Sequence, residues 1–443
     1  VPTVPSIGAA FTYWLRLGCI SFGGPAGQIA IMHQDLVERR RWISEGRFLH
    51  ALNYCMLLPG PEAQQLATYI GWLMHRTPGG IAAGVLFVLP SLLVLISLSW
   101  IYVTFGQTPL IAAIFYGIKP AVTAIVAQAA HRIGSRALKN ALLWVIAAAS
   151  FIAVAVLHWP FPVIVGSAAL CGMIGGKLAP NKFRTGASHD GAVKSYGRAL
   201  IDDDTPRPAH THYRATRVGL VVVCSAALWG APLAVLIFAF GASGLLPQMS
   251  FFFTKAALLT FGGAYAVLPY VYQGAVAHFG WLTPAQMIDG LALGETTPGP
   301  LIMVVAFVGF LGGYGNPVFG PTSSAISGVV AATVVTWFTF LPSFLFILAG
   351  GPLVESTRGE LRFTAPLTAI TAAVVGVILS LAVFFAEHTI FPDGLSAPPD
   401  WFAVTLSIAA LVALIRYRMS LFRVLGGCAV FGALWQLVWL PLS

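Results

Sequence analysis

Glycine and proline clusters within apolar sequence are the residues of this chain best suited to bind a ligand. A double glycine, Gly23 and Gly24, and a Pro-Gly-Pro hinge at 59–61 each interrupt a stretch that would otherwise form a membrane helix. Such a break frees backbone N–H groups and exposes the positive end of the half-helix that follows, which favours an anion. Pro25 fits the first turn of that half-helix, where no N–H is needed.

The same clusters occur a second time. One constant offset of 239 residues pairs Gly23 with Gly262, and the hinge at 59–61 with a hinge at 298–300. A lone double glycine in a membrane helix would more often serve close helix packing. Duplication in register favours a functional role instead, and it indicates two homologous repeats of the kind found in many transporters.

Two basic residues also occupy matching places in the two copies. Arg16 and Lys255 are separated by the same offset, and both lie in apolar stretches. A cation within a membrane span costs about 3 kcal/mol on insertion scales, so a repeated one suggests a partner or a substrate. The alternative is that both side chains extend along the helix to the membrane interface.

Acidic residues are rarer, and two of them adjoin the hinges. Glu62 follows the first Pro-Gly-Pro and Glu295 precedes the second. Each carboxylate is suited either to accept a proton during transport or to cap a half-helix, and the sequence favours neither role. The candidate substrate-binding residues are Arg16, Phe22, Gly23, Gly24, Pro25, Pro59, Gly60, Pro61, Glu62, Lys255, Phe261, Gly262, Gly263, Glu295, Thr297, Pro298, Gly299 and Pro300.

Membrane helices must position these residues. Of the 443 residues, 58% are hydrophobic and 9% are charged, and the mean hydropathy is +0.84. Apolar runs of about 20 residues recur along the chain, which is long enough for a helix to cross a bilayer, and no alternating strand pattern occurs. The composition predicts an all-α polytopic membrane protein with about 11–13 membrane segments.

Charge and motifs exclude several other classes of protein. The net charge of +9 comes mostly from Arg and Lys in short loops, which is typical of membrane topology and not of nucleic-acid binding. The five cysteines lack the spacing of metal ligands, and no catalytic or nucleotide-binding motif occurs. We therefore expect no enzyme activity, no metal and no cofactor.

The duplication divides the chain into four parts. Residues 1–178 are expected to form the first membrane repeat, 179–217 a cytoplasmic linker, 218–245 an extra connecting helix, and 246–443 the second repeat. A first helix over 7–32 should be broken near Gly23. The apolar pieces on either side of the hinge at 59–61 have about 12 residues each, or roughly 18 Å of helix, which predicts a re-entrant or broken helical hairpin.

The relative orientation of the repeats is harder to derive. The loop 38–47 carries four arginines, whereas its counterpart 277–286 carries no charged Lys, Arg, Asp or Glu, which favours inverted repeats. Helix counting leaves two arrangements open. Hairpins that span the membrane give inverted halves but place Arg39–Arg41 outside, and re-entrant hairpins place this loop inside but make the halves parallel.

Several of these motifs occur together in one known family. FGGPAGQ at 22–28, ERRRWI at 38–43, LPGPE at 58–62, FGGAYAVLP at 261–269 and TPGP at 297–300 resemble the chromate ion transporter family, in its long form with two repeats. The resemblance implies inverted repeats and a carrier that exports chromate across the bacterial inner membrane. It also implies chromate as substrate. For a carrier of tetrahedral oxyanions we expect sulfate as a competitor, and a homodimer is common for this class of carrier.

Export of chromate is physically reasonable. Chromate is a dianion, and a cell interior at −100 mV favours its expulsion by about 4.6 kcal/mol, so no coupling ion is required, although proton coupling stays open. Two alternatives remain: a carrier of sulfate or another small anion, and a membrane chromate reductase, for which the chain has no redox-cofactor ligands.

Overall fold

The protein is almost entirely helical. The computed structural model describes residues 5–22, 24–183, 196–206, 208–261, 263–356 and 364–439, and these contain no strand beyond one isolated bridge between Ile43 and Ile201. The first repeat contains α1 Ile7–Ile20, α2 Gly24–His33, the π-helix η1 Gln34–Arg39, α3 Glu45–Leu57, α4 Glu62–Phe105, α5 Pro109–Ala137, α6 Ala141–Ala155 and α7 Phe161–Leu178. The short α8 Pro180–Phe183 and η2 Ala209–Thr211 follow, and α9 Ala215–Phe240 leads to the second repeat.

The second repeat reproduces the first, element by element. It contains α10 Leu245–Leu259, α11 Ala264–Tyr272, the π-helix η3 Gln273–His278, α12 Pro284–Thr296, η4 Leu301–Met303, α13 Val304–Gly315, α14 Ser324–Ser356, α15 Thr364–Ile390, α16 Trp401–Ile415, α17 Leu421–Leu434 and η5 Trp435–Trp439. The offset of 239 residues maps α3 onto α12, and even the π-helix η1 onto η3, without a shift. The predicted duplication is therefore present in the structure.

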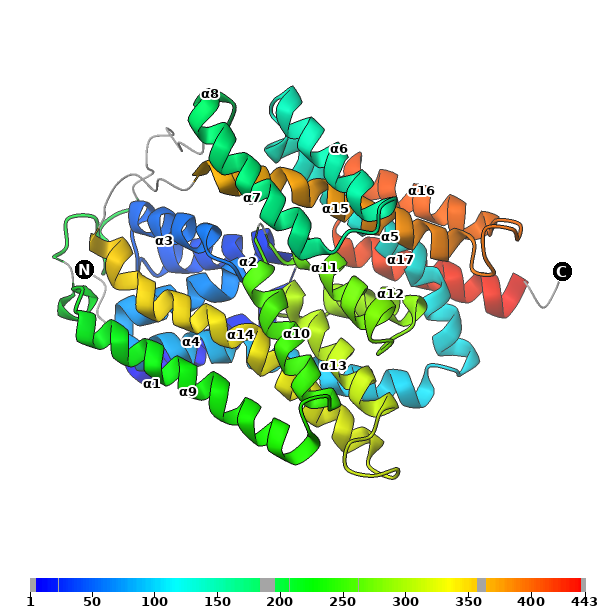
Figure 1. Ribbon diagram of the computed structural model, residues 1–443, viewed down its shortest axis with the longest axis horizontal. Helices are drawn as coiled ribbons and strands as arrows, with labels where there is room; N and C mark the ends of the chain where they lie inside the picture. Colours follow the sequence, from blue (N-terminus) through cyan, green and yellow to red (C-terminus); the bar gives the residue numbers. More distant parts are fainter. Residues whose placement is uncertain are drawn as a thin grey trace.

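The helices suit a bilayer. Six of them are long and apolar enough to cross it: α4, α5, α7, α9, α14 and α15. The shorter apolar helices α6, α16 and α17 pack against α15 and α5, so they run beside these spans. In Figure 1, α1, α3, α4, α9 and α14 lie on one side, α5, α15, α16 and α17 on the other, and α2 and α10–α13 between them. The prediction of an all-α polytopic membrane protein with two repeats is confirmed.

The break after α1 is the turn of a hairpin, which corrects the expectation of one broken helix over 7–32. The rings of Tyr13 on α1 and Trp42 beyond η1 lie 5.0 Å apart. A continuous helix would separate these residues by roughly 40 Å at 1.5 Å per residue. The equivalent pair in the second repeat, Phe252 and Trp281, is 5.6 Å apart, so α10 and α11 form the same hairpin.

The hinges also reverse the chain. The rings of Tyr54 on α3 and Tyr69 on α4 lie 5.7 Å apart across the first hinge. A second reversal follows within α4, where His75 and Arg76 have non-helical backbone angles and Arg76 has a φ of 58°. The short arm 62–74 therefore returns to the side on which α3 began, and the rest of α4 crosses the membrane.

Equivalent long helices of the two repeats pack antiparallel. A Cβ placed on Gly84 of α4 would lie 2.5 Å from the Phe344 ring of α14, and one on Gly80 would lie 3.4 Å from Leu348, so residue numbers rise along one helix as they fall along the other. A two-fold axis that relates antiparallel spans is perpendicular to them and lies in the membrane plane. The repeats are therefore inverted, as predicted.

The hairpins also remove the conflict in helix counting. In the first repeat both hairpins return to their starting side, and α4 after its kink, α5, α6 and α7 then cross the membrane in turn. The repeat thus ends on the side where it began. The single additional crossing by α9 inverts the second repeat.

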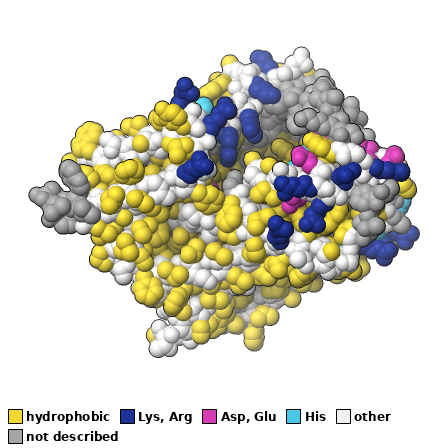
Figure 2. Space-filling model, turned by 180° about the vertical axis from the view of Figure 1, so that it is seen from behind, with side chains coloured by type: hydrophobic (Ala, Val, Ile, Leu, Met, Phe, Trp, Pro, Cys, Tyr) yellow, Lys and Arg dark blue, Asp and Glu magenta, His cyan; other side chains and the backbone are white. Residues whose placement is uncertain are grey.

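Basic residues gather at one end of the molecule. The loops at 38–44, 137–141 and 416–420 and the segment 176–183 lie at this end, which we term the basic end. The loops at 106–108, 157–160, 241–244, 279–283, 316–323 and 391–400 at the opposite end contain no Lys or Arg. Figure 2 shows the dark-blue Lys and Arg side chains on one half of the molecule, around a hollow.

The described part of the linker packs against the basic end. The Leu200 N–H donates to the Arg41 carbonyl oxygen at 2.9 Å, and the Ser44 N–H donates to the Ile201 carbonyl oxygen at the same distance. The Ser44 hydroxyl also donates to Asp203 at 2.8 Å. This segment is therefore attached to the loop between η1 and α3.

Candidate functional site

At the centre of the protein, each hinge binds the helix break of the other repeat. The Gly60 N–H donates to the Thr260 carbonyl oxygen at 2.8 Å, and the Gly299 N–H donates to the Ser21 carbonyl oxygen at 2.7 Å. These two bonds are related by the repeat offset. The four interruptions that the sequence singled out therefore converge, although they are far apart in the chain.

Glycine is required at both hinges. Gly60 and Gly299 have φ values of 126° and 99°, a region that side chains rarely adopt. A Cβ on Gly60 would lie 2.5 Å from the Ser343 hydroxyl oxygen, and one on Gly299 would lie 2.6 Å from the Ser91 Cβ. Each hinge thus packs against a serine of the opposite repeat.

The breaks themselves also use glycine. Gly24 and Gly263 precede α2 and α11 with φ values of 71° and 99°. The predicted residues Gly23 and Gly262 lie outside the described residues. Phe22 and Phe261 flank the breaks and are half-buried, and the Phe22 ring packs against Phe422 of α17 at 5.3 Å between centroids.

Buried polar atoms surround this crossing of breaks and hinges. Gln28 of α2 donates from its amide nitrogen to the Gly299 carbonyl oxygen. Within the described part of the chain, the Ser21 and Ser91 hydroxyls and the Gln28 and Gln65 amide oxygens are buried without a hydrogen-bond partner. Unpaired buried polar groups are costly, so this region is suited to exchange partners when the helices move.

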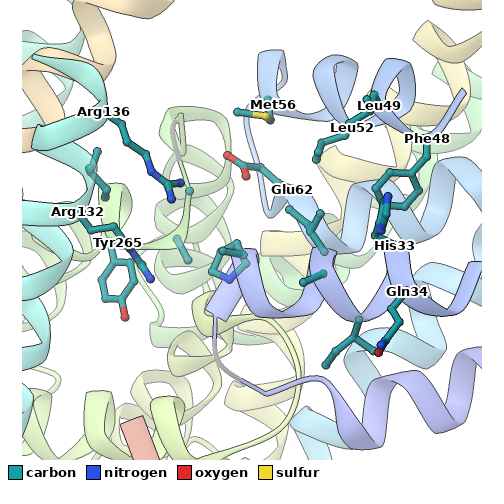
Figure 3. Close-up of a pocket in the computed structure, with 18 of the residues that line it drawn as sticks. His33, Gln34, Phe48, Leu49, Leu52, Met56, Glu62, Arg132, Arg136 and Tyr265 are labelled. Atoms are coloured by element: carbon teal, nitrogen blue, oxygen red, sulfur yellow. The ribbon is translucent and has the colours of Figure 1, made fainter. Parts of the chain in front are cut away.

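A cavity of about 760 Å³ extends from the basic end toward this crossing. One wall comes from α2, α3 and the first residue of α4, and the opposite wall comes from α5 and the start of α11 (Figure 3). Pro25, Glu62 and Gly263 are the predicted site residues that line it. Because α2, α4 and α11 all begin at the cavity, the positive ends of three half-helices face it.

Two arginines that the sequence interpretation did not select also line the cavity. Arg132 and Arg136 lie one turn apart on α5, and in Figure 3 both extend from the same wall. The Arg132 guanidinium carbon lies 5.9 Å from the centre of the Tyr265 ring. The Tyr265 hydroxyl donates to the Glu295 carboxylate, so Glu295 is buried behind this wall and does not line the cavity.

The two predicted basic residues lie elsewhere. Arg16 is exposed on α1 and does not line the cavity. Lys255 lines a second cavity, of about 1050 Å³, together with Gln273 and Glu387. That cavity lies near the opposite end, beside Trp159 and Phe161, where Gln273 accepts a hydrogen bond from the Phe161 N–H at 3.1 Å.

The remaining predicted residues shape the hinges. Pro59 and Pro298 are half-buried, and Pro61 and Pro300 are buried. Thr297 is also buried, and its hydroxyl donates to the Gly294 carbonyl oxygen at 3.1 Å, so it ends α12 instead of facing the cavity. The Pro59 carbonyl oxygen accepts a hydrogen bond from the Gln65 amide at 2.8 Å.

The comparison with protein families agrees with this duplicated architecture. A family model described as chromate transporter matches residues 8–174 and again residues 247–433. The chain belongs to the chromate transporter family. The two matched segments begin 239 residues apart, the same offset that relates the hairpins and hinges.

Curated members of the chromate transporter family are similar over most of their length. The chain is 29% identical over 426 residues to a chromate transport protein of Cupriavidus metallidurans, covering 95% of this chain and 91% of that protein. It is 33% identical over 393 residues to a chromate transport protein of Pseudomonas aeruginosa, covering 88% and 83%. An uncharacterized transporter of Methanocaldococcus jannaschii is 26% identical, covering 94% and 90%. No solved structure matches the chain.

Membership of the chromate transporter family indicates that the chain is a transporter. Family membership and the six long apolar helices together identify the chain as a multi-pass bacterial membrane protein. The cavity, the half-helix starts and the two arginines are candidates for parts of its transport path.

Proposed function

We propose that the protein exports chromate from the cytoplasm and that the substrate binds in the cavity between α2, α3, α5 and α11. Two relatives over most of the chain are named chromate transport protein. The observation that carries the proposal is the placement of Arg132 and Arg136 in a cavity that three half-helix N-termini face. This arrangement supplies positive charge and backbone donors to a small oxyanion.

The electrostatics favour a doubly charged guest. A unit charge 4 Å from an opposite charge gains about 4 kcal/mol at an effective dielectric constant of 20. Two guanidiniums therefore match the charge of a dianion such as chromate, and their planar donor groups bind oxyanion oxygens with defined geometry. The half-helix ends add partial positive charge without further side chains.

The sidedness supports export. The loops named above at the opposite end contain no Lys or Arg, so the positive-inside rule assigns the basic end to the cytoplasm. The cavity with the arginines is thus open to cytoplasmic chromate. An interior potential of −100 mV then favours outward movement of a dianion by about 4.6 kcal/mol, so the membrane potential alone is a sufficient driving force.

The second cavity supplies the other half of the path. It lies near the opposite end, and none of the described residues of the breaks or hinges lines it. In the proposed transport cycle, this conformation is the one that is open to the cytoplasm and closed to the outside. Inverted repeats exchange such states by exchanging the conformations of their two halves.

Sulfate should compete with chromate, because both are tetrahedral dianions and the cavity recognises charge and oxygen atoms. The alternative function is a carrier of sulfate or of another small anion. The relative rates for chromate, sulfate and a carboxylate separate these two functions.

Flux measurements with the purified full-length protein in liposomes test the proposal. Liposomes loaded with chromate should lose it faster when a potassium gradient and valinomycin make their interior negative. Unlabelled sulfate added with the chromate should slow the loss. Chromate loss at a rate independent of the potential would refute electrogenic export, and sulfate movement without chromate movement would select the alternative.

A further inference from the structure

A carboxylate stands opposite the arginines of the cavity. Glu62 is the first residue of α4 and belongs to the wall formed by α2 and α3, whereas Arg132 and Arg136 belong to α5. In Figure 3 the Glu62 carboxylate and the Arg136 guanidinium point toward one another across the cavity. An acidic group that lines an anion site would be unfavourable for binding unless it had a role of its own.

Glu62 differs from the three described acidic residues that are buried among the helices. Glu295 accepts a hydrogen bond from Tyr265, Asp289 accepts one from Tyr102 at 2.8 Å, and Glu355 pairs with Arg47. Among the described residues, by contrast, Glu62 forms no hydrogen bond or ion pair. Its carboxylate is therefore free to move to the arginines.

No described residue at the mouth of the cavity pairs with Glu62 either. His33 lies there between two carboxylates, with its Nδ1 atom 3.3 Å from Glu38 and its Nε2 atom 2.5 Å from Glu45. His33 therefore already contacts both of these carboxylates. Glu62 is the lining carboxylate that faces Arg132 and Arg136 without such a contact.

We propose that Glu62 is a tethered counter-anion that moves onto Arg132 and Arg136 when the carrier closes without substrate. An empty carrier has to close around its site to return, and closure around two unpaired guanidiniums would leave uncompensated charge in a medium of low dielectric constant. The Glu62 carboxylate offsets part of this charge. An arriving dianion displaces it, since like charges repel at short range and the dianion balances both guanidiniums.

This role makes net transport possible. A carrier that can close only with substrate bound exchanges one anion for another but does not move anions in one direction. With Glu62 bound in place of the substrate, the empty carrier can close and return. The second repeat lacks the device, because the residue equivalent to Glu62 is Leu301.

The inference rests on the proposed function, and flux in two modes separates them. Chromate-loaded liposomes are diluted either into buffer without chromate, which measures net efflux, or into buffer with chromate, which measures exchange. The proteins compared are the parent, Glu62→Gln, Glu62→Asp and Asp35→Asn. Asp35 pairs with Arg39 at 3.3 Å on η1 outside the cavity, so its variant controls for the loss of one negative charge.

Glu62→Gln should lower net efflux about tenfold while exchange stays within about twofold of the parent, because only the empty return step loses its counter-anion. The same variant should bind chromate about fivefold to tenfold more tightly in detergent, since a competing anion is gone. Glu62→Asp should restore net efflux in part, and Asp35→Asn should behave as the parent in both modes.

Two results would overturn the inference alone. Net efflux by Glu62→Gln at the rate of the parent would show that no counter-anion is needed. Equal losses of net efflux and exchange, with unchanged or weaker chromate binding, would show that Glu62 holds the structure or the substrate instead. Absence of chromate flux in both modes for the parent would overturn the proposed function itself.

Discussion

Arg47 Nη1 lies 2.6 Å from Glu355 Oε2, and both side chains are buried. The pair joins α3 of the first repeat to the end of α14 in the second, and the Tyr69 hydroxyl donates to the other carboxylate oxygen at 2.6 Å. The pair therefore couples the hairpin of α3 and the first arm of α4 to a long helix of the opposite repeat at the basic end. The hairpin that carries Glu62 is held from outside its own repeat.

Loss of this pair should destabilise the protein strongly. Glu355→Ala removes one partner and leaves the Arg47 charge buried, a change that typically costs about 3–5 kcal/mol. Thermal unfolding in detergent should show a clear decrease in midpoint temperature. Asp35→Asn, which breaks the exposed pair with Arg39, should change stability by about 1 kcal/mol or less. Equal midpoints for the two variants would contradict the assignment.

The cavity arginines should determine substrate affinity. Arg132→Ala and Arg136→Ala each remove a charged hydrogen-bond donor, worth about 1.5–3 kcal/mol, and should weaken chromate binding about tenfold to a hundredfold. Arg16→Ala is the matched control, because Arg16 is exposed on α1 outside the cavity. Binding to the detergent-solubilised variants measures the effect. A larger loss for Arg16→Ala than for either α5 variant would show that the cavity is not the site.

The hinge glycines should tolerate no side chain. Gly60→Ala and Gly299→Ala combine a positive φ with contacts of 2.5 and 2.6 Å to the opposite repeat, and each should lower stability by at least about 2 kcal/mol. Gly230→Ala on α9 meets no atom within 4 Å and should be neutral. Yield and thermal midpoint measure the difference. Neutral hinge variants would mean that the packing around Gly60 and Gly299 leaves room for a Cβ.

The contact of the linker with the membrane part should weaken in acid. Burial lowers the pKa of His210 from its ordinary value of 6.5; a hydrogen bond to the Trp72 carbonyl oxygen partly opposes this, and Arg76 and Arg217 lower the pKa further. A depressed pKa means that the neutral ring is favoured in the docked state. The contribution of His210 is therefore fully present above pH 6.5 and is lost as the pH falls below that value.

Hydrogen exchange of the segment around His210 measures this loss. Exchange should accelerate between pH 7 and pH 5 after correction for the intrinsic pH dependence, and a His210→Gln variant should lose most of that acceleration. His212→Gln supplies the control at a neighbouring histidine. A pH response that persists in His210→Gln but disappears in His212→Gln would contradict the prediction, because it would assign the response to His212.

The sequence predicted the backbone of the site better than its charges. Breaks and hinges are determined locally, because Gly and Pro end helices wherever they occur, and the constant offset showed that they belong together. A re-entrant hairpin was one of the forms expected at the hinge 59–61, but the reversal of the chain at the breaks was not evident. A break near Gly23 is compatible with a kinked span or with a hairpin, and only contacts such as that between Tyr13 and Trp42 distinguish the two.

The basic residues predicted to bind the substrate do not line the proposed binding cavity. The sequence of a helix that is apolar all round does not show which of its faces points toward the cavity. Arg16 and Lys255 recur at the repeat offset, yet Arg16 is exposed on α1 and Lys255 lines the other cavity. Arg132 and Arg136 were not selected, although both lie on α5, which continues to Ala137. Their spacing of four residues was the available signal, since it places both on one helix face.

The exchange of hydrogen bonds between Gly60 and Thr260, and between Gly299 and Ser21, makes each half of the chain the structural complement of the other. A polypeptide with a single repeat would expose a donor and an acceptor that nothing in its own fold satisfies. It would need a companion inserted upside down in the same bilayer. During synthesis, likewise, the first half has to await the second before its core can close.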